Sequence, residues 1–178
     1  MAIRYDKINL SDLGVRAEVA RFDARGEVTE WHVMLHVEPR CDLFQKQMQR
    51  IYEAEDRLTG MPGFEGSRYV MKRYFLSDST NQQPLMRKQP DISISIIQQQ
   101  PLDGSKIAVW LYMQSHTQVA NENGMVVVSH NGYRHLWKMG MHQHKGDSAW
   151  QTESVLIEYE EALQYFGATL ADNCVRTW

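Results

Sequence analysis

The fold is decided by residues 28–60, which read VTEWHVMLHVEPRCDLFQKQMQRIYEAEDRLTG. Between Trp31 and Val37, bulky apolar residues occupy every second position, which is the pattern of a strand with one buried face. The same alternation occurs at residues 14–22, just upstream. The sequence therefore predicts a β-hairpin formed by residues 14–22 and 28–37.

The second part of the stretch predicts an amphipathic helix. Its apolar residues recur every three or four positions and form one stripe; they are Phe44, Met48, Ile51, Ala54 or Glu55, and Leu58. Asp42, with Gln45 three residues later, has the pattern of a capping box at the start of the helix. Gly60 is a suitable residue to end it.

Further strands are expected downstream of the helix. Residues 67–77, 92–97 and 107–113 each show period-two alternation. Pro101-Leu102-Asp103-Gly104 is a strong turn sequence between the last two, so we expect them to form a second hairpin.

The pattern of hairpin, helix and strand then returns. A hairpin around Asn131-Gly132 is followed by an amphipathic helix at residues 151–166, and a strand begins at Val175. A recurrence at this spacing predicts two copies of one unit, residues 1–117 and residues 118–178, the second copy being cut short inside a strand. Convergent patterning in α+β proteins is the alternative explanation.

Several segments resemble the Rid family, also called YjgF. Gly167-Ala168-Thr169-Leu170-Ala171-Asp172-Asn173-Cys174-Val175 is similar to the family's Gly-Ala-Ser-Leu-Asp-Asp-Val-Val loop. Val70-Met71-Lys72-Arg73-Tyr74-Phe75-Leu76-Ser77-Asp78 is similar to the family strand that ends Phe-Leu-x-Asp. The resemblance implies an α+β fold of the Rid/YjgF (chorismate mutase-like) type: a mixed, mainly antiparallel sheet with two helices packed on one face.

The resemblance also implies a function. Rid imine deaminases hold the substrate carboxylate with an arginine, and the matching position here is Ile92. We therefore expect the first unit to be a non-catalytic scaffold, in a protein that acts on small carboxylate metabolites by imine deamination or chorismate-type hydrolysis. Arg176-Thr177-Trp178 resembles the Arg-x-Trp of chorismatase-like relatives. Arg176 is our candidate for binding the carboxylate, with an ion pair between the units as the alternative role.

A basic region with interleaved tyrosines provides a second candidate site. Arg68, Lys72 and Arg73 lie beside Tyr69 and Tyr74, a combination that binds single-stranded RNA in other proteins. Family relatives carry the labels translation initiation inhibitor and endoribonuclease. A solvated sheet face or a subunit contact explains the same residues, and the net charge of −3 argues against a dedicated nucleic-acid binder.

The remaining predictions concern metals, assembly and location. His130, His135, His142 and His144 are the only residues with metal-like content, but no cysteine or acid completes a zinc set at ligand spacing. We predict no metal and no cofactor. Rid units form trimers, so the resemblance implies self-association, and a purely structural role is a third possible function. The sequence has no apolar run of membrane-spanning length and no signal peptide, so we expect a cytoplasmic protein.

Overall fold

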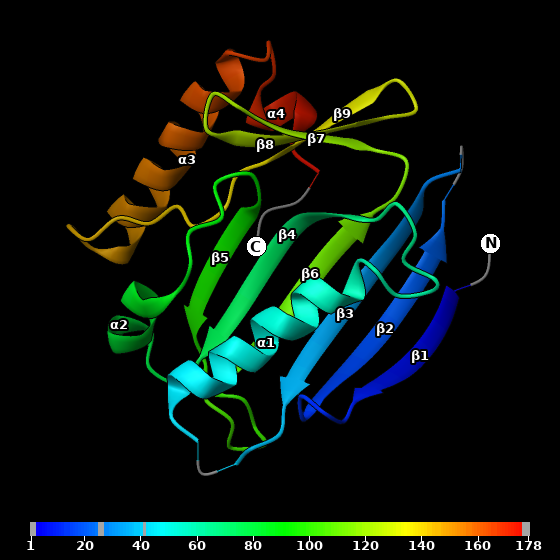
Figure 1. The fold of residues 1–178 in the computed structure, drawn as a ribbon. Helices are drawn as coiled ribbons and strands as arrows, with labels where there is room; N and C mark the ends of the chain where they lie inside the picture. The colour runs from blue at the N-terminus through cyan, green and yellow to red at the C-terminus, as the bar shows by residue number, and fades with distance from the viewer. Residues whose placement is uncertain (1–2, 25–26, 41, 176–178) are drawn as a thin grey trace.

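A computed structural model describes residues 3–24, 27–40 and 42–175 of the chain (Figure 1). The strands are β1 (Ile3–Leu10), β2 (Val15–Asp23), β3 (Thr29–Val37), β4 (Arg68–Leu76), β5 (Ser93–Gln98), β6 (Ile107–Gln114), β7 (Gln118–Glu122), β8 (Met125–His130) and β9 (Tyr133–Trp137). The helices are α1 (Phe44–Leu58), α2 (Ser79–Gln82), the short 3-10 helix η1 (Gln83–Leu85), α3 (Ser148–Gln164) and α4 (Leu170–Asn173).

Six of the strands form one large sheet in the order β1-β2-β3-β6-β4-β5. All neighbours are antiparallel except β4 and β5, which run parallel. The predicted first hairpin is confirmed as β2 and β3. The predicted hairpin of residues 92–97 and 107–113 is wrong, because β6 inserts between β3 and β4. Six of the eight residues of β6 are buried apolar side chains on both faces, which suits a central strand rather than the arm of an edge hairpin.

Helix α1 covers one face of the large sheet (Figure 1). Its stripe of Phe44, Ile51, Ala54 and Leu58 packs on β2, β3 and β6 and forms the main core. The predicted capping box is wrong. Leu43 is the N-cap and makes no side-chain cap hydrogen bond, while the Asp42 carboxylate accepts a hydrogen bond from Arg50 at 2.9 Å.

Strands β7, β8 and β9 form a second, three-stranded antiparallel sheet. Its Val126 and Val128 pack against Met71 and Tyr112, on the face of the large sheet that α1 does not cover. The small sheet therefore covers part of that opposite face, at β4 and β6. We call the remainder, over β1, β2, β3 and the middle of β6, the open face.

The second long helix lies on the small sheet. The Arg134 guanidinium of β9 lies 5.7 Å from the centre of the Phe166 ring, just beyond the end of α3. The predicted α+β class with a mixed, mainly antiparallel sheet is confirmed, but α1 and α3 do not share one face of one sheet, because each helix backs a different sheet (Figure 1). No helix within the described residues is both long and apolar enough to cross a membrane.

The segment between β9 and α3 passes close to the edge of the large sheet at Gly140. This glycine has φ +72°, and a Cβ atom here would lie 3.0 Å from the backbone oxygen of Ile94. We expect Gly140→Ala to destabilise the protein by about 2 kcal/mol, since the left-handed conformation alone costs about 1–2 kcal/mol. Thermal and urea unfolding measure this loss.

Gly132→Ala is the matched control for that prediction. Gly132 has a similar φ of +77°, but nothing lies within 4 Å of the added methyl group. The control variant should therefore lose only the conformational part, about 1 kcal/mol. Equal losses in the two variants would show that the approach to Ile94 costs nothing.

Candidate functional site

The open face carries a groove of about 450 Å³. Its floor is formed by outward-facing residues of four strands, and its lining includes Tyr5, Lys7, Glu18, His32, Met34 and Trp110. Because successive strand residues point to opposite faces, these side chains alternate along their strands with the core residues under α1. The same alternation that builds the core therefore places an aromatic and charged set on the other side.

The rings of His32 and Trp110 line the groove, and the buried ring of Tyr112 stacks against His32. The His32 ring on β3 lies 4.8 Å from the Tyr112 ring and 5.7 Å from the Trp110 ring, both on β6. The pairing of His32 with Tyr112 across the two strands sets this geometry. Of these residues, His32 is exposed and Trp110 is half-buried, whereas Tyr112 is buried.

Hydrogen bonds fix the protonation of His32. The indole N–H of Trp110 donates to His32 Nδ1 at 3.2 Å, so the neutral tautomer that fits carries its proton on Nε2. Burial lowers the pKa of His32 and the Glu30 carboxylate only partly opposes this. His32 is therefore a neutral hydrogen-bond donor at pH 7.

Tyr112 is held in place at the border of the small sheet. Its hydroxyl donates to Glu30 at 2.9 Å, and its ring lies 5.3 Å from that of Trp137 on β9. Burial, with the nearby Glu30 carboxylate, raises the pKa of Tyr112. One wall of the aromatic stack is consequently rigid.

Cationic side chains flank the stack. The Arg73 guanidinium of β4 lies 5.8 Å from the centre of the Trp110 ring, and Lys7 of β1 lies in the groove lining. The ion pair of Lys7 with Glu18 is 3.7 Å long and largely exposed, so it is weak and leaves Lys7 available. Rings that stack, with cations beside them, can hold a flat ligand that carries a negative charge.

The predicted basic site is divided between two faces of the sheet. Lys72 and Arg73 are adjacent in β4, so Arg73 faces Trp110 while Lys72 points under α1. The Lys72 side chain is 1% exposed and its Nζ lies 2.7 Å from Glu55 Oε2. Lys72 is therefore not available to a nucleic acid, and the grouping with Arg68 and Arg73 is wrong in this respect.

Lys72 belongs instead to a buried polar network. Its Nζ also donates to Gln89 at 2.7 Å and lies 4.1 Å from the centre of the Tyr69 ring. The other Glu55 oxygen accepts the Tyr74 hydroxyl at 2.8 Å. Burial lowers the pKa of Lys72, and Glu55 opposes that shift. Each charged group has partners, as a stable buried ion pair requires, so this network fastens α1 to β4.

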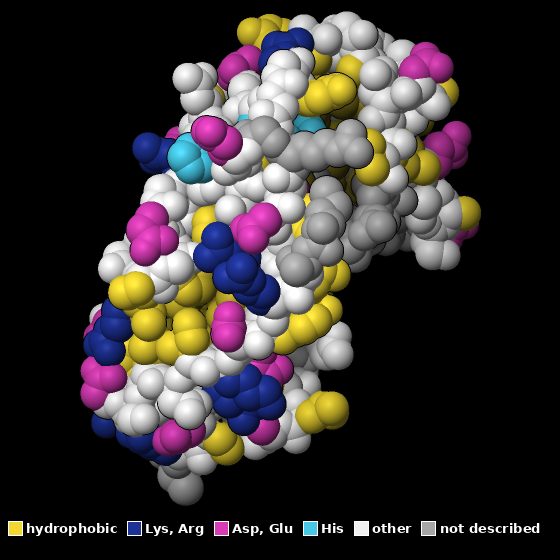
Figure 2. Space-filling view, turned by 90° about the vertical axis from the view of Figure 1, so that its right-hand side faces the viewer, with side chains coloured by type: hydrophobic (Ala, Val, Ile, Leu, Met, Phe, Trp, Pro, Cys, Tyr) yellow, Lys and Arg dark blue, Asp and Glu magenta, His cyan; other side chains and the backbone are white. Residues whose placement is uncertain are grey.

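The surface charge does not form a basic stripe. Arg68 is exposed at the start of β4, and Arg87 is paired with Asp56 at 3.0 Å. On the face seen in Figure 2, Lys and Arg side chains are interspersed with Asp and Glu side chains. This distribution gives a phosphate backbone no continuous track on that face.

The four histidines that were considered as metal ligands form two separate pairs. The rings of His130 and His135 lie 4.7 Å apart, and those of His142 and His144 lie 4.6 Å apart. Within the described residues, no group of three or more histidine, cysteine or acidic side chains could hold a metal ion. Arg176, the predicted carboxylate ligand, lies outside the described residues.

The groove was not predicted from the sequence. His32 and Trp110 were assigned to strands, but the pairing of their strands was not predicted. The available signal was the frequency of aromatic or charged residues at the outward positions of several strands, among them Tyr5, His32 and Trp110. Models of known protein families give no match to the chain, and none of the curated proteins matches it.

Proposed function

We propose that the chain is the Rid-like scaffold of a protein that acts on small carboxylate metabolites, and that its open face binds a carboxylate with a flat ring. The resemblance in sequence implies a sheet backed by a helix, and the large sheet with α1 is compatible with it. The proposal further assigns residues 118–178 to a second, partial unit.

The observation that carries the proposal is the pair of stacked His32 and Trp110 rings in a groove that Lys7 also lines, with Arg73 beside Trp110. The ring of a ligand stacks on Trp110, and Arg73, which lies beside that ring, attracts the carboxylate. His32 Nε2–H supplies a neutral donor beside them. A cation, an aromatic face and a donor within one concave site favour a small organic anion.

The first unit has no arginine where the deaminases of the family carry theirs. Ile92 lies in the turn directly before β5, and an isoleucine side chain cannot bind a carboxylate. We therefore propose that this unit binds without deaminating. The 178-residue chain should show no turnover of 2-imino acids, and deamination of these substrates would contradict a scaffold role.

Binding of benzoate tests the groove directly. We expect ¹H–¹⁵N spectra of the labelled chain to show saturable shifts of the Trp110 indole signal on addition of benzoate. Trp110→Leu should weaken binding at least about fivefold, because an aromatic stacking contact contributes about 1–3 kcal/mol. Arg73→Gln should weaken it about fivefold, since it removes the positive charge.

Two controls distinguish benzoate binding in this groove from nonspecific binding elsewhere on the protein. Trp150→Leu removes an indole that is 48% exposed on α3 and should leave benzoate binding unchanged. Benzyl alcohol, which has the ring without the charge, should bind more weakly than benzoate. Equal binding to the Trp110→Leu variant refutes the groove. Tighter, salt-sensitive binding of single-stranded RNA would favour the RNA-binding alternative.

A further inference from the structure

The strands and helix of the small sheet repeat those of the large sheet. In each case three antiparallel strands precede a long helix. Helix α1 starts at Phe44, 15 residues after β3 starts at Thr29, and α3 starts at Ser148, 15 residues after β9 starts at Tyr133. Adding 104 to a residue number in α1 therefore gives its counterpart in α3.

A side-chain hydrogen bond follows the same repeat. Gln47 Nε2 donates to the backbone oxygen of Asp42 at 3.4 Å. Its counterpart Gln151 donates in the same way to the backbone oxygen of Gly146, the counterpart of Asp42, at 3.1 Å. In both helices one glutamine therefore bridges the first turn, although only α3 also has a side-chain N-cap, Asp147.

The repeat stops where the large sheet gains its fourth strand. There, β6 pairs with the outer edge of β3 and packs under α1. The other side-chain atom of Gln47, Oε1, accepts the backbone N–H of Lys106 at 2.7 Å, just before β6 begins. In the small sheet β9 is an edge strand, and no described residue donates to Gln151 Oε1.

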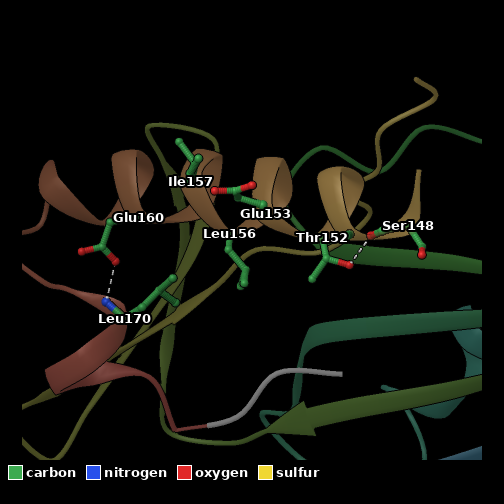
Figure 3. Close-up of a pocket in the computed structure, with 8 residues that line it drawn as sticks. Ser148, Thr152, Glu153, Leu156, Ile157, Glu160 and Leu170 are labelled. Atoms are coloured by element: carbon green, nitrogen blue, oxygen red, sulfur yellow. Dashed lines mark hydrogen bonds between the residues drawn. The ribbon is translucent and has the colours of Figure 1, made fainter. Parts of the chain in front are cut away.

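The side of α3 that corresponds to the β6 side of α1 is hollow, and its lining combines apolar residues with Glu153 and Glu160. A groove of about 640 Å³ runs along the helix and is lined by Thr152, Leu156, Ile157 and Leu170. Figure 3 shows Thr152 and Leu156 pointing from α3 into the space that Leu170 of α4 borders. Leu156 is 41% exposed, whereas its counterpart Tyr52 is 6% exposed and packs against Tyr74 of β4.

We propose that this surface, the outer edge of β9 together with the groove on α3, docks an extended β-strand of the same pattern as β6. The strand pairs antiparallel with β9 and places apolar side chains against Leu156. A backbone N–H just before the strand donates to Gln151 Oε1, as that of Lys106 does to Gln47. Strand addition of this kind derives affinity from main-chain hydrogen bonds and selectivity from alternate side chains. The inference does not depend on the proposed ligand of the open face.

A synthetic peptide tests the proposal. Its sequence is that of residues 104–114, which comprise β6 and the turn before it, followed by two lysines for solubility. We expect saturable binding of the fluorescein-labelled peptide to the 178-residue chain by anisotropy, and slower hydrogen exchange of β9 amides in the complex. A scrambled peptide of the same composition should not bind.

Two pairs of variants locate the binding. Leu156→Glu should weaken it at least tenfold, while Leu102→Glu, which makes the same change at a fully exposed turn residue, should not alter it. Gln151→Ala should weaken it about threefold, and Gln164→Ala, at an exposed position of the same helix, should not.

Three outcomes overturn the proposal. The first is absence of peptide binding, and the second is equal binding by the Leu156→Glu variant and the parent chain. The third is self-association of the chain, seen by sedimentation velocity, that Leu156→Glu abolishes, because it would assign the surface to a second copy whose own β6 is already paired on both edges. Circular dichroism of each variant verifies that the fold is retained.

Discussion

Glu55→Ala is expected to lower the free energy of unfolding by about 3–5 kcal/mol, the cost of removing one partner of a buried ion pair. The Glu55 side chain is fully buried, and it accepts hydrogen bonds from Lys72 and Tyr74. The substitution leaves the Lys72 ammonium under α1 with only Gln89 as a hydrogen-bond acceptor. Urea unfolding at pH 7 measures the loss.

The neighbouring carboxylate provides a matched control. Asp56 pairs with Arg87 at 3.0 Å, but its side chain is 65% exposed. Asp56→Ala should therefore cost no more than about 1 kcal/mol. A loss below 1 kcal/mol for Glu55→Ala would show that the Lys72 ammonium reaches water when its partner is removed.

A double substitution separates the charge from the packing. Glu55→Leu combined with Lys72→Met removes both charges and keeps most of the side-chain volume. Apolar replacement of a whole buried pair is often neutral or stabilising, so the double variant should be more stable than Glu55→Ala by about 2 kcal/mol or more. The difference in free energy of unfolding between the two variants measures how much of the Glu55→Ala loss comes from leaving Lys72 unpaired.

The sequence was sufficient to predict the elements that local pattern determines. The stripe of α1, the hairpin of β2 and β3, and the turn at Asn131-Gly132 all follow from spacing within one or two elements. Asn131 has φ +49° and Gly132 has φ +77°, as a two-residue hairpin turn of this type requires. In each of these cases the residue pattern within one or two elements was sufficient to predict the structure.

Long-range pairing was not predictable in the same way. Strand β1 was missed because Arg4, Asp6 and Lys7 interrupt its apolar pattern, which an edge strand tolerates. The insertion of β6 between β3 and β4 depends on residues about 75 positions apart, such as Val33 and Leu111. The continuous apolar run of β6 suits a central strand, but no local signal identifies β3 and β4 as its neighbours.

The candidate sites show the same limit. In the sequence Glu55 was an alternative to Ala54 in the apolar stripe of a helix, and Lys72 was one cation of a basic region. Their pairing became visible only when α1 was placed on β4. Counting charges along the chain could not reveal that adjacent cations, Lys72 and Arg73, serve opposite faces of one strand.

Stability is expected to fall steeply above about pH 10, the ordinary pKa of tyrosine. Burial raises the pKa values of Tyr69, Tyr74 and Tyr112, with further increases from Glu55 for the first two and from Glu30 for Tyr112. A raised folded-state pKa gives stability that is complete below the unfolded value of 10.0 and is lost as the pH rises towards the folded value. Each buried tyrosine therefore contributes a slope of about 1.4 kcal/mol per pH unit above pH 10.

Lys72 acts in the opposite direction but over a different range. Burial lowers its folded-state pKa, so its contribution to stability rises with pH until the unfolded lysine also loses its proton near 10.5. One lysine cannot offset three tyrosines, and above that pH it adds no further slope.

Urea midpoints measured from about pH 8 to 11.5 should therefore fall beyond pH 10. Tyr74→Phe should remove the contribution of one tyrosine from the slope, whereas Tyr5→Phe, at a residue that is 76% exposed, should leave the slope unchanged. An unaltered slope in the Tyr74 variant would mean that this hydroxyl ionises without unfolding the protein, which its hydrogen bond to a buried carboxylate opposes.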